Sequence, residues 1–186
     1  MRPRTIGREP LRAGGLSTRT LLVCGALAAV QTVVSASVSA VTPGLAAMMP
    51  PAYALVAALH TIMPFLARLL TGAPWTATIT SAITGVLVWP FSAVGPLMMF
   101  VFLAAGLAFD LALRRPGAPT RRRLAAAAVS AGVALFLVSL PVFSPAHLVP
   151  GILAATLAGR LLGEGVAVVV ASALVKGLRR VGVRSH

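Results

Sequence analysis

The sequence predicts an all-α, polytopic membrane protein with six transmembrane helices and with its N- and C-termini in the cytoplasm. Of its 186 residues, 58% are hydrophobic and 10% are charged, and its mean hydropathy of +0.95 is well above that of a water-soluble domain. Six helices of about 20 residues would use about 120 residues and leave short loops and two tails. The basic residues gather in three clusters that long apolar stretches separate. These observations favour a lipid-embedded bundle without a separate soluble domain.

Six apolar segments can be assigned within a transmembrane domain over residues 20–178, between basic cytoplasmic tails over 1–19 and 179–186. The first segment directly follows the N-terminal tail. The second is preceded by residues 43–50, whose Pro and Gly content fits a loop or a short helix. The third is short, and the sixth begins near Pro150, a residue suited to the first turn of a helix. The predicted segments are 20–41, 51–70, 75–89, 94–113, 124–143 and 150–178.

The charges predict the orientation of these segments. Sixteen Lys and Arg residues against three acids give a net charge of +13. In a soluble protein this excess would suggest nucleic acid as a partner, but clusters between apolar stretches are typical of cytoplasmic charges that orient helices in a lipid bilayer. The predicted outer loops, 42–51, 90–93 and 144–149, contain no Lys or Arg, so six crossings place every cluster inside. The clusters are Arg2, Arg4, Arg8, Arg12 and Arg19; Arg114, Arg115, Arg121, Arg122 and Arg123; and Lys176, Arg179, Arg180 and Arg184.

A cleaved secretory signal is an alternative for the first segment. A basic stretch, an apolar run and the small residues Ala-Ser-Val-Ser-Ala over 36–40 resemble such a signal and its cleavage site. The apolar run is longer than the roughly 7–15 residues of a typical signal, which favours a retained helix. A Ser or Ala at the N-terminus of the purified protein would show cleavage.

Catalytic motifs are absent from the sequence. Three acids and three histidines leave few candidates, and there is no His-Glu-x-x-His zinc motif, no Gly-x-Ser-x-Gly elbow and no P-loop. We therefore expect no enzymatic activity, metal or cofactor in this chain. Its energy source would be a partner or an ion gradient.

Arg160 and Glu164 are the strongest candidates for function, because they lie one helical turn apart inside the sixth segment. Ionisable groups within a span are costly and usually face a cavity or another polar group, which favours a functional role. The alternative is an i, i+4 ion pair that neutralises itself and stabilises the helix. On the same helix, Ala155, Gly159 and Gly163 form a ridge of small residues that predicts close helix packing.

A polar stripe runs along the outer half of the first segment. Its residues, Gln31, Ser35, Ser39 and Thr42, recur at spacings of four, four and three and so share one side of a helix. The stripe could bind a solute, or it could join helices by hydrogen bonds, which is the more frequent role.

Two further polar features lie in the second and fourth segments. His60 is mid-span, and Pro64 cannot donate to its carbonyl oxygen, which predicts a kink beside the imidazole. A proton or ligand site is conceivable there, although a histidine that packs between helices is the commoner case. Asp110 is expected to pair with Arg114 at i, i+4, and Arg68 is expected to reach the same cytoplasmic surface.

Aromatic, thioether and imidazole side chains surround the predicted outer loops. Tyr and Trp near the ends of spans commonly form an interfacial belt, but such a set could also stack against a flat heterocycle that arrives from outside. The set comprises Met48, Met49, Tyr53, Trp89, Phe91 and His147.

Over about residues 19–181 the chain resembles the S components of energy-coupling factor (ECF) transporters, which are small bacterial membrane proteins that capture vitamins. The resemblance depends on the six-span layout with both termini inside and on the small-residue first helix, Leu-Leu-Val-Cys-Gly-Ala-Leu-Ala-Ala-Val over 21–30. It also depends on Pro-Pro-Ala-Tyr-Ala-Leu-Val-Ala-Ala-Leu over 50–59, followed by Gly-Val-Leu-Val over 85–88 and Gly-Leu-Ala-Phe-Asp over 106–110.

The resemblance implies a function in uptake across a bacterial cell membrane. The chain would bind a small vitamin-like heterocycle from outside, such as a thiamine-related compound, and dock on a transmembrane T component whose two ATPase subunits use ATP. Similar proteins dock through an Ala-x-x-x-Ala pair in the first helix, where this chain has Gly25 and Ala29, so Gly replaces the first Ala. By location, the expected ligand-binding residues are Gln31, Met49, Tyr53, Trp89 and His147. Arg160 and Glu164 are further candidates because of their charge within a span.

Two other functions stay open from the sequence. In one, the chain is a membrane assembly or scaffold subunit without a solute site, and its polar residues only hold helices together. In the other, it is a self-sufficient secondary transporter, which six short spans without a visible inverted repeat support poorly.

Overall fold

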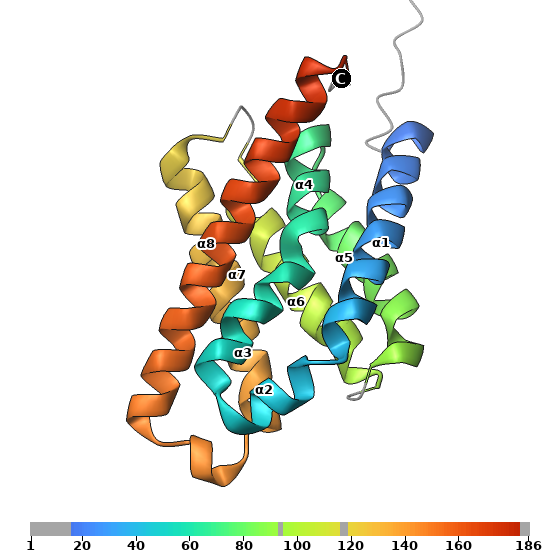
Figure 1. Ribbon diagram of the computed structural model, residues 1–186. Coiled ribbons are helices and arrows are strands. Elements are labelled where there is room, and N and C mark those ends of the chain that lie inside the picture. Colours follow the sequence, from blue (N-terminus) through green and yellow to red (C-terminus); the bar gives the residue numbers. More distant parts are fainter. Residues whose placement is uncertain (1–15, 93–94, 116–118, 183–186) are drawn as a thin grey trace, which may run out of the picture.

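The computed structural model describes residues 16–92, 95–115 and 119–182. Within these ranges every regular element is a helix (Figure 1). The α-helices are α1 (Thr18–Ser39), α2 (Thr42–Met48), α3 (Pro50–Ala57), α4 (Ile62–Thr71), α5 (Thr76–Val88), α6 (Leu97–Ala112), α7 (Arg121–Ser139) and α8 (Pro150–Arg180). Short 3-10 turns are η1 (Ala58–Thr61), η2 (Trp89–Phe91), η3 (Leu140–Val142) and η4 (Pro145–His147).

Local sequence signals account for several helix ends. The Ser17 side chain accepts a hydrogen bond from the Thr20 amide at the start of α1, and the Thr120 side chain accepts one from the Arg123 amide at the start of α7. Pro150 occupies the first turn of α8, as predicted. The tails over 1–15 and 183–186 lie outside the described residues, so the predicted tail boundaries stay predictions.

The second predicted segment is a helix with a break in the middle. It runs from α3 through η1 to α4, and η1 contains His60. Pro64 has no amide hydrogen to donate to the His60 carbonyl oxygen, which explains why regular α-helix fails here. A departure from regular α-helix is thus present at the position where these two residues predicted a kink.

Among the described residues, six apolar helical segments are present, but they differ in length. Four are long and apolar enough to cross a membrane: α1, the segment 50–71, α7 and α8. The other two, 76–91 and 97–112, are shorter apolar helices. The chain thus has the helices of a membrane protein, while the count of six complete crossings stays a prediction.

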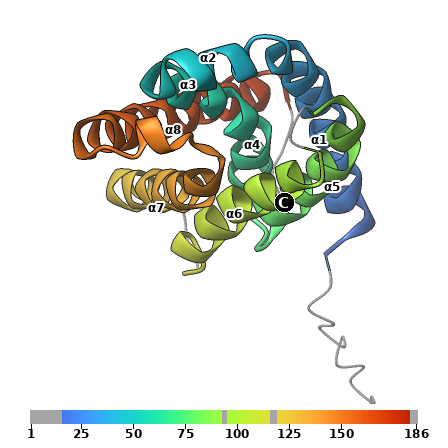
Figure 2. The same cartoon turned by 90° about the horizontal axis from the view of Figure 1, so that it is seen from below.

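The helices pack closely at some glycines, which have no side chain to keep the neighbouring helix away. A Cβ atom at Gly159 would lie 2.8 Å from the Pro51 carbonyl oxygen, and one at Gly163 would lie 2.8 Å from the Ala58 Cβ atom. The predicted small-residue ridge therefore brings α8 against the segment of α3 and η1, although Ala155 is exposed. Viewed from below, α4 lies in the middle of the bundle (Figure 2), where the Phe65 ring stacks on the Phe109 ring at 3.9 Å.

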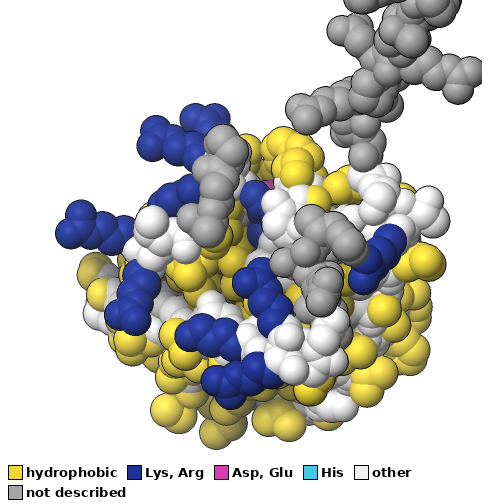
Figure 3. Space-filling view, turned by 90° about the horizontal axis from the view of Figure 1, so that it is seen from above, with side chains coloured by type: hydrophobic (Ala, Val, Ile, Leu, Met, Phe, Trp, Pro, Cys, Tyr) yellow, Lys and Arg dark blue, Asp and Glu magenta, His cyan; other side chains and the backbone are white. Residues whose placement is uncertain are grey.

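The two ends of the bundle differ in charge. The start of α1, the end of α8 and the start of α7 lie at the upper end in Figure 1. Seen from above, Lys and Arg side chains are spread over this end (Figure 3). The opposite end is formed by α2, η4 and the connections beside them. This asymmetry agrees with the predicted sorting of basic clusters to one side of the membrane.

Candidate functional site

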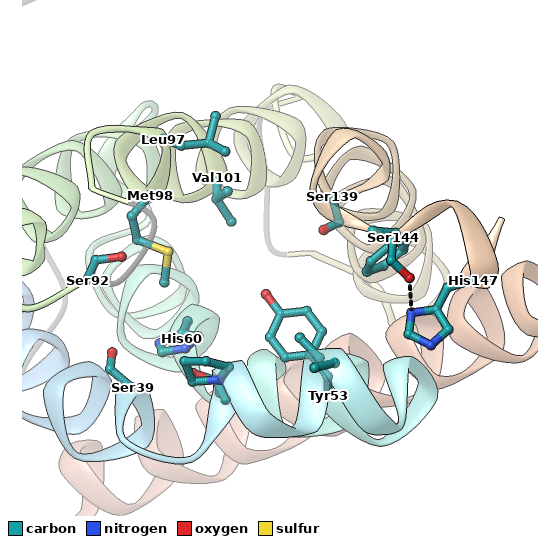
Figure 4. Close-up of a pocket in the computed structure, with 15 residues that line it drawn as sticks. Ser39, Tyr53, His60, Ser92, Leu97, Met98, Val101, Ser139, Ser144 and His147 are labelled. Atoms are coloured by element: carbon teal, nitrogen blue, oxygen red, sulfur yellow. Dashed lines mark hydrogen bonds between the residues drawn. The ribbon is translucent and has the colours of Figure 1, made fainter.

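A cavity of about 360 Å³ lies at the end opposite the basic surface. This volume is within the range of roughly 300–1,000 Å³ that is usual for small-molecule sites. Residues from α1, α2, α3, η1, α6, α7 and the loops around η4 line it (Figure 4). Its polar lining is Ser39, Thr42, Tyr53, His60, Ser92, Ser139, Ser144 and His147, and its apolar lining is Pro43, Ala46, Ala47, Leu97, Met98, Val101 and Phe143.

The lining offers hydroxyls, imidazoles and apolar surface. Figure 4 shows the Tyr53 hydroxyl and the Met98 side chain directed into the open space between α3 and α6. The Ser144 hydroxyl and His147 Nδ1 are joined by a hydrogen bond of 3.1 Å at one side. No carboxylate, Lys or Arg is among the described residues that line the main cavity. The described lining of the main cavity is therefore uncharged apart from what its two imidazoles can carry.

A small extension of about 10 Å³ lies beside the cavity and shares the Tyr53 and His60 walls. Arg160 and Thr61 also line this extension. Because α8 runs from the cavity end toward the basic end, Arg160 is nearer to the cavity than Glu164 by about 6 Å of helix rise.

Arg160 and Glu164 do not form the i, i+4 ion pair that the sequence offered as the alternative to a functional role. The ion pair found within the described ranges joins Arg68 and Asp110 instead. The Arg160 guanidinium lies 5.6 Å from the centre of the Tyr53 ring, and its Nη2 is 3.5 Å from the Ser139 hydroxyl. Glu164 Oε2 accepts a 2.7 Å hydrogen bond from Thr61, whereas its Oε1 has no partner among the described residues. The two side chains thus have separate partners although they are one turn apart.

Gln31 is buried behind the cavity and is not among its lining residues. Its Nε2 donates to the Leu59 carbonyl oxygen and to the Ser35 hydroxyl, and its Oε1 accepts from the Met63 amide. These contacts join α1 to the broken helix that contains His60. Gln31 of the predicted polar stripe therefore joins helices, and Ser39 and Thr42 line the cavity, so a role of the stripe in binding a solute stays a prediction.

The other predicted site residues are divided between the cavity and the outer surface. Tyr53 and His147 line the cavity. Met49 and Trp89 do not, and their side chains are 58% and 49% exposed. Ala29 is exposed on α1, and a Cβ atom at Gly25 would meet nothing within 4 Å. The predicted docking pair is thus on an open face of α1.

His60 lines both the cavity and its extension, whereas the sequence had favoured a histidine that only packs between helices. Its Nδ1 lies 2.8 Å from the Ser35 hydroxyl, and its ring meets the Phe102 ring edge-on at 5.7 Å. The Pro64 signal predicted a special backbone at this residue but did not show which way the ring would face.

The predicted pairing of Asp110 with Arg114 is wrong. Asp110 Oδ1 lies 3.0 Å from Arg68 Nε, and Arg114 is exposed. A buried carboxylate gains more from a cation that reaches it inside the bundle than from one that water can solvate. Arg68 consequently points into the bundle, whereas the sequence had suggested that it reached the cytoplasmic surface.

Comparisons with known proteins point to one fold. No family model and no curated protein matches the sequence. A solved structure, described as the crystal structure of an S-component of an ECF transporter, superposes with a TM-score of 0.81 at 22% sequence identity. The alignment covers 90% of this chain and 88% of that one. The resemblance predicted from the sequence is therefore confirmed at the level of the fold, and this chain has the fold of an ECF transporter S component.

Proposed function

We propose that the chain is a substrate-binding membrane subunit of an ECF-type importer and takes a small vitamin-like heterocycle into the cavity between α1, α3 and α6. The observation that carries this proposal is the position of the 360 Å³ cavity, which lies at the end opposite the basic surface in a fold shared with an S component. If the basic end faces the cytoplasm, the cavity faces the side from which a nutrient arrives.

The cavity chemistry fits a compact heterocycle. Apolar lining from Val101, Leu97 and Phe143 can cover ring faces, and the Tyr53 ring offers an aromatic surface for stacking. Hydroxyls and imidazoles around this surface can orient polar ring substituents. A thiamine-related compound is one candidate, and other vitamins of similar size are equally compatible with this lining.

The proposed mechanism is capture by this chain and energy supply by its partners. A T component would dock on the open face of α1 at Gly25 and Ala29, where small residues allow close approach of another helix. Two ATPase subunits on the basic side would supply the energy, and this chain would contribute binding and docking without making or breaking a bond. Recovery of a T component and ATPases with the affinity-purified chain would support this part of the proposal.

Thermal stability of the purified protein tests the binding function. The compounds are thiamine, riboflavin, biotin, nicotinate and pantothenate, each added in turn. A ligand at about 100 times its dissociation constant should stabilise the protein by about 2.7 kcal/mol. Ala46→Trp, which places a large ring in the cavity, should abolish the stabilisation, whereas Ala154→Trp on the exposed face of α8 should retain it.

The scaffold function makes the opposite prediction for the same measurement. A subunit whose polar groups only hold helices together has no site for a solute. Absence of stabilisation by every compound, in a preparation that unfolds cooperatively, would favour that function over the one proposed.

A further inference from the structure

The hydrogen bonds behind the cavity fix the orientation of the Gln31 amide. The Met63 backbone amide can only donate, so the Gln31 atom 3.1 Å away is the oxygen. The nitrogen then donates one hydrogen to the Leu59 carbonyl oxygen and the other to the Ser35 hydroxyl oxygen, each at 3.1 Å. The carboxamide thus has one arrangement that satisfies all three neighbours.

The Ser35 hydroxyl links the oriented Gln31 amide to His60. Its oxygen accepts from Gln31 and lies 2.8 Å from His60 Nδ1. A serine hydroxyl has a single hydrogen, and the described residues offer it no acceptor other than His60 Nδ1. Nδ1 therefore accepts, and in the neutral imidazole the ring hydrogen must be on Nε2.

The His60 ring lines both the cavity and its extension, and within the described part of the chain its one hydrogen bond is that of Nδ1 with Ser35. Arg160, which lines the same extension, donates from Nη2 to the Ser139 hydroxyl at 3.5 Å, whereas its buried Nε atom has no hydrogen-bond partner among the described residues. A buried donor that has no partner is costly, so a bound molecule that supplied an acceptor at this wall would gain a hydrogen bond.

We infer that the wall shared by the cavity and its extension is a hydrogen-bond donor site, in which His60 Nε2–H from the cavity and the Arg160 guanidinium from the extension take an acceptor group of the ligand. The inference rests on the proposed function and adds the chemistry of the ligand to it. The ligand is a ring compound that presents a carboxylate, a ring carbonyl or a ring nitrogen to this wall, and no ammonium group. Gln31 and Ser35 act through His60 and are positioning residues.

The tautomer of His60 can be measured without any ligand. Nitrogen-15 NMR of histidine-labelled protein separates ring nitrogens that carry a hydrogen from those that do not, and the chain has only three histidines. The His60 signals are the ones that remain when His147 and His186 are both replaced by Gln. We expect a bare Nδ1 and a protonated Nε2 at neutral pH. A hydrogen on Nδ1 would overturn the inference, whatever the protein binds.

The second arm measures binding of nicotinate, biotin, pantothenate, riboflavin and thiamine to the wild type, to a variant of the cavity wall and to a control outside the cavity. His60→Phe keeps a ring of similar size but removes the donor, and Ala154→Leu changes an exposed position of α8 that does not line the cavity. Loss of one hydrogen bond should weaken binding about tenfold for an uncharged acceptor and about a hundredfold for a carboxylate. Ala154→Leu should leave the affinity unchanged. Arg160→Gln separates the two acceptor types, because it should affect the acids most.

The outcomes distinguish this inference from the proposed function. A compound that binds the wild type and His60→Phe with equal affinity would overturn the donor site and leave the binding function intact. If none of the five compounds binds, the proposed function and the ligand chemistry inferred here are both contradicted. Stability of each variant is checked by its unfolding temperature, and the tautomer result stands even if His60→Phe fails to fold.

Discussion

The Arg68–Asp110 pair is buried between α4 and α6, and nearly every polar atom of the two side chains has a neighbour. Arg68 Nη1 and Nη2 donate to the Gly72 and Leu113 carbonyl oxygens at 2.6 and 2.8 Å. Asp110 Oδ2 accepts from both the amide and the hydroxyl of Thr78 at 2.8 Å. The remaining Nε and Oδ1 atoms form a close ion pair at 3.0 Å that is not aligned as a hydrogen bond. This group therefore joins α4, α5 and α6 near the basic end.

Replacing Asp110 by Ala should lower the free energy of unfolding by about 3–5 kcal/mol, because it leaves the Arg68 guanidinium buried without its partner. Arg114→Ala should cost less than about 0.5 kcal/mol, since the Arg114 side chain is exposed. Denaturant unfolding in a fixed detergent measures both. Equal costs for the two variants would support the i, i+4 pairing suggested by the sequence and contradict the structure.

The sequence predicted which residues are chemically unusual better than it predicted their partners. Asp110, Arg160 and Glu164 stood out because charge within an apolar helix is rare. Their contacts could not be predicted, because Arg68 and Asp110 are 42 positions apart and Thr61 is 103 positions from Glu164. A sequence shows only local spacing such as i, i+4. In the structure, Asp110 and Glu164 instead contact residues that are distant in the sequence.

At the scale of elements, the contact of α8 with α3 positions both Arg160 and Tyr53. The absence of a side chain at Gly159 lets the Pro51 carbonyl oxygen approach α8. The Gly165 position on the same helix is open, with nothing within 4 Å of a Cβ atom. These two glycines offer a matched test of close packing within one helix.

Gly159→Ala should destabilise the protein by about 1–3 kcal/mol, because its methyl group would lie 2.8 Å from a backbone oxygen. Gly165→Ala should be neutral or stabilising by about 0.5–1 kcal/mol, since Ala is the better helix former. Unfolding temperatures of the two variants give the comparison. If Gly165→Ala proved the more damaging change, the α3–α8 contact would be wrongly placed.

The order and approximate bounds of the apolar segments could be predicted from hydropathy and from Pro and Gly positions. Segment six, expected over 150–178, is α8 (Pro150–Arg180), and segment one, expected over 20–41, is α1 (Thr18–Ser39). The cavity could not be predicted in this way. It depends on how α2 and the loops around η4 fold over the bundle end, and those contacts are not periodic in the sequence.

At the scale of the whole molecule, one end is basic and the other holds the cavity. The uptake function requires that the cavity end face outward. A cysteine at Ser144, beside the cavity, should therefore react with a membrane-impermeant thiol reagent on intact cells, and a cysteine at Arg122 should react only after the cells are opened. The natural Cys24 is buried and is replaced by Ala in both variants. Labelling of Arg122→Cys on intact cells would reverse the predicted orientation.

Ligand protection of a single cysteine in the cavity is the most direct test of solute capture from outside. Ala46→Cys in the Cys24→Ala background places a thiol on the cavity wall. On intact cells, this thiol should be labelled by the impermeant reagent. A saturating compound from the vitamin series should slow its labelling at least tenfold. The same compound should not change the labelling of a control variant with an exposed cysteine at Ala154. If Ala46→Cys were labelled at the same rate without a compound and in the presence of each compound, capture of a solute in this cavity would be contradicted.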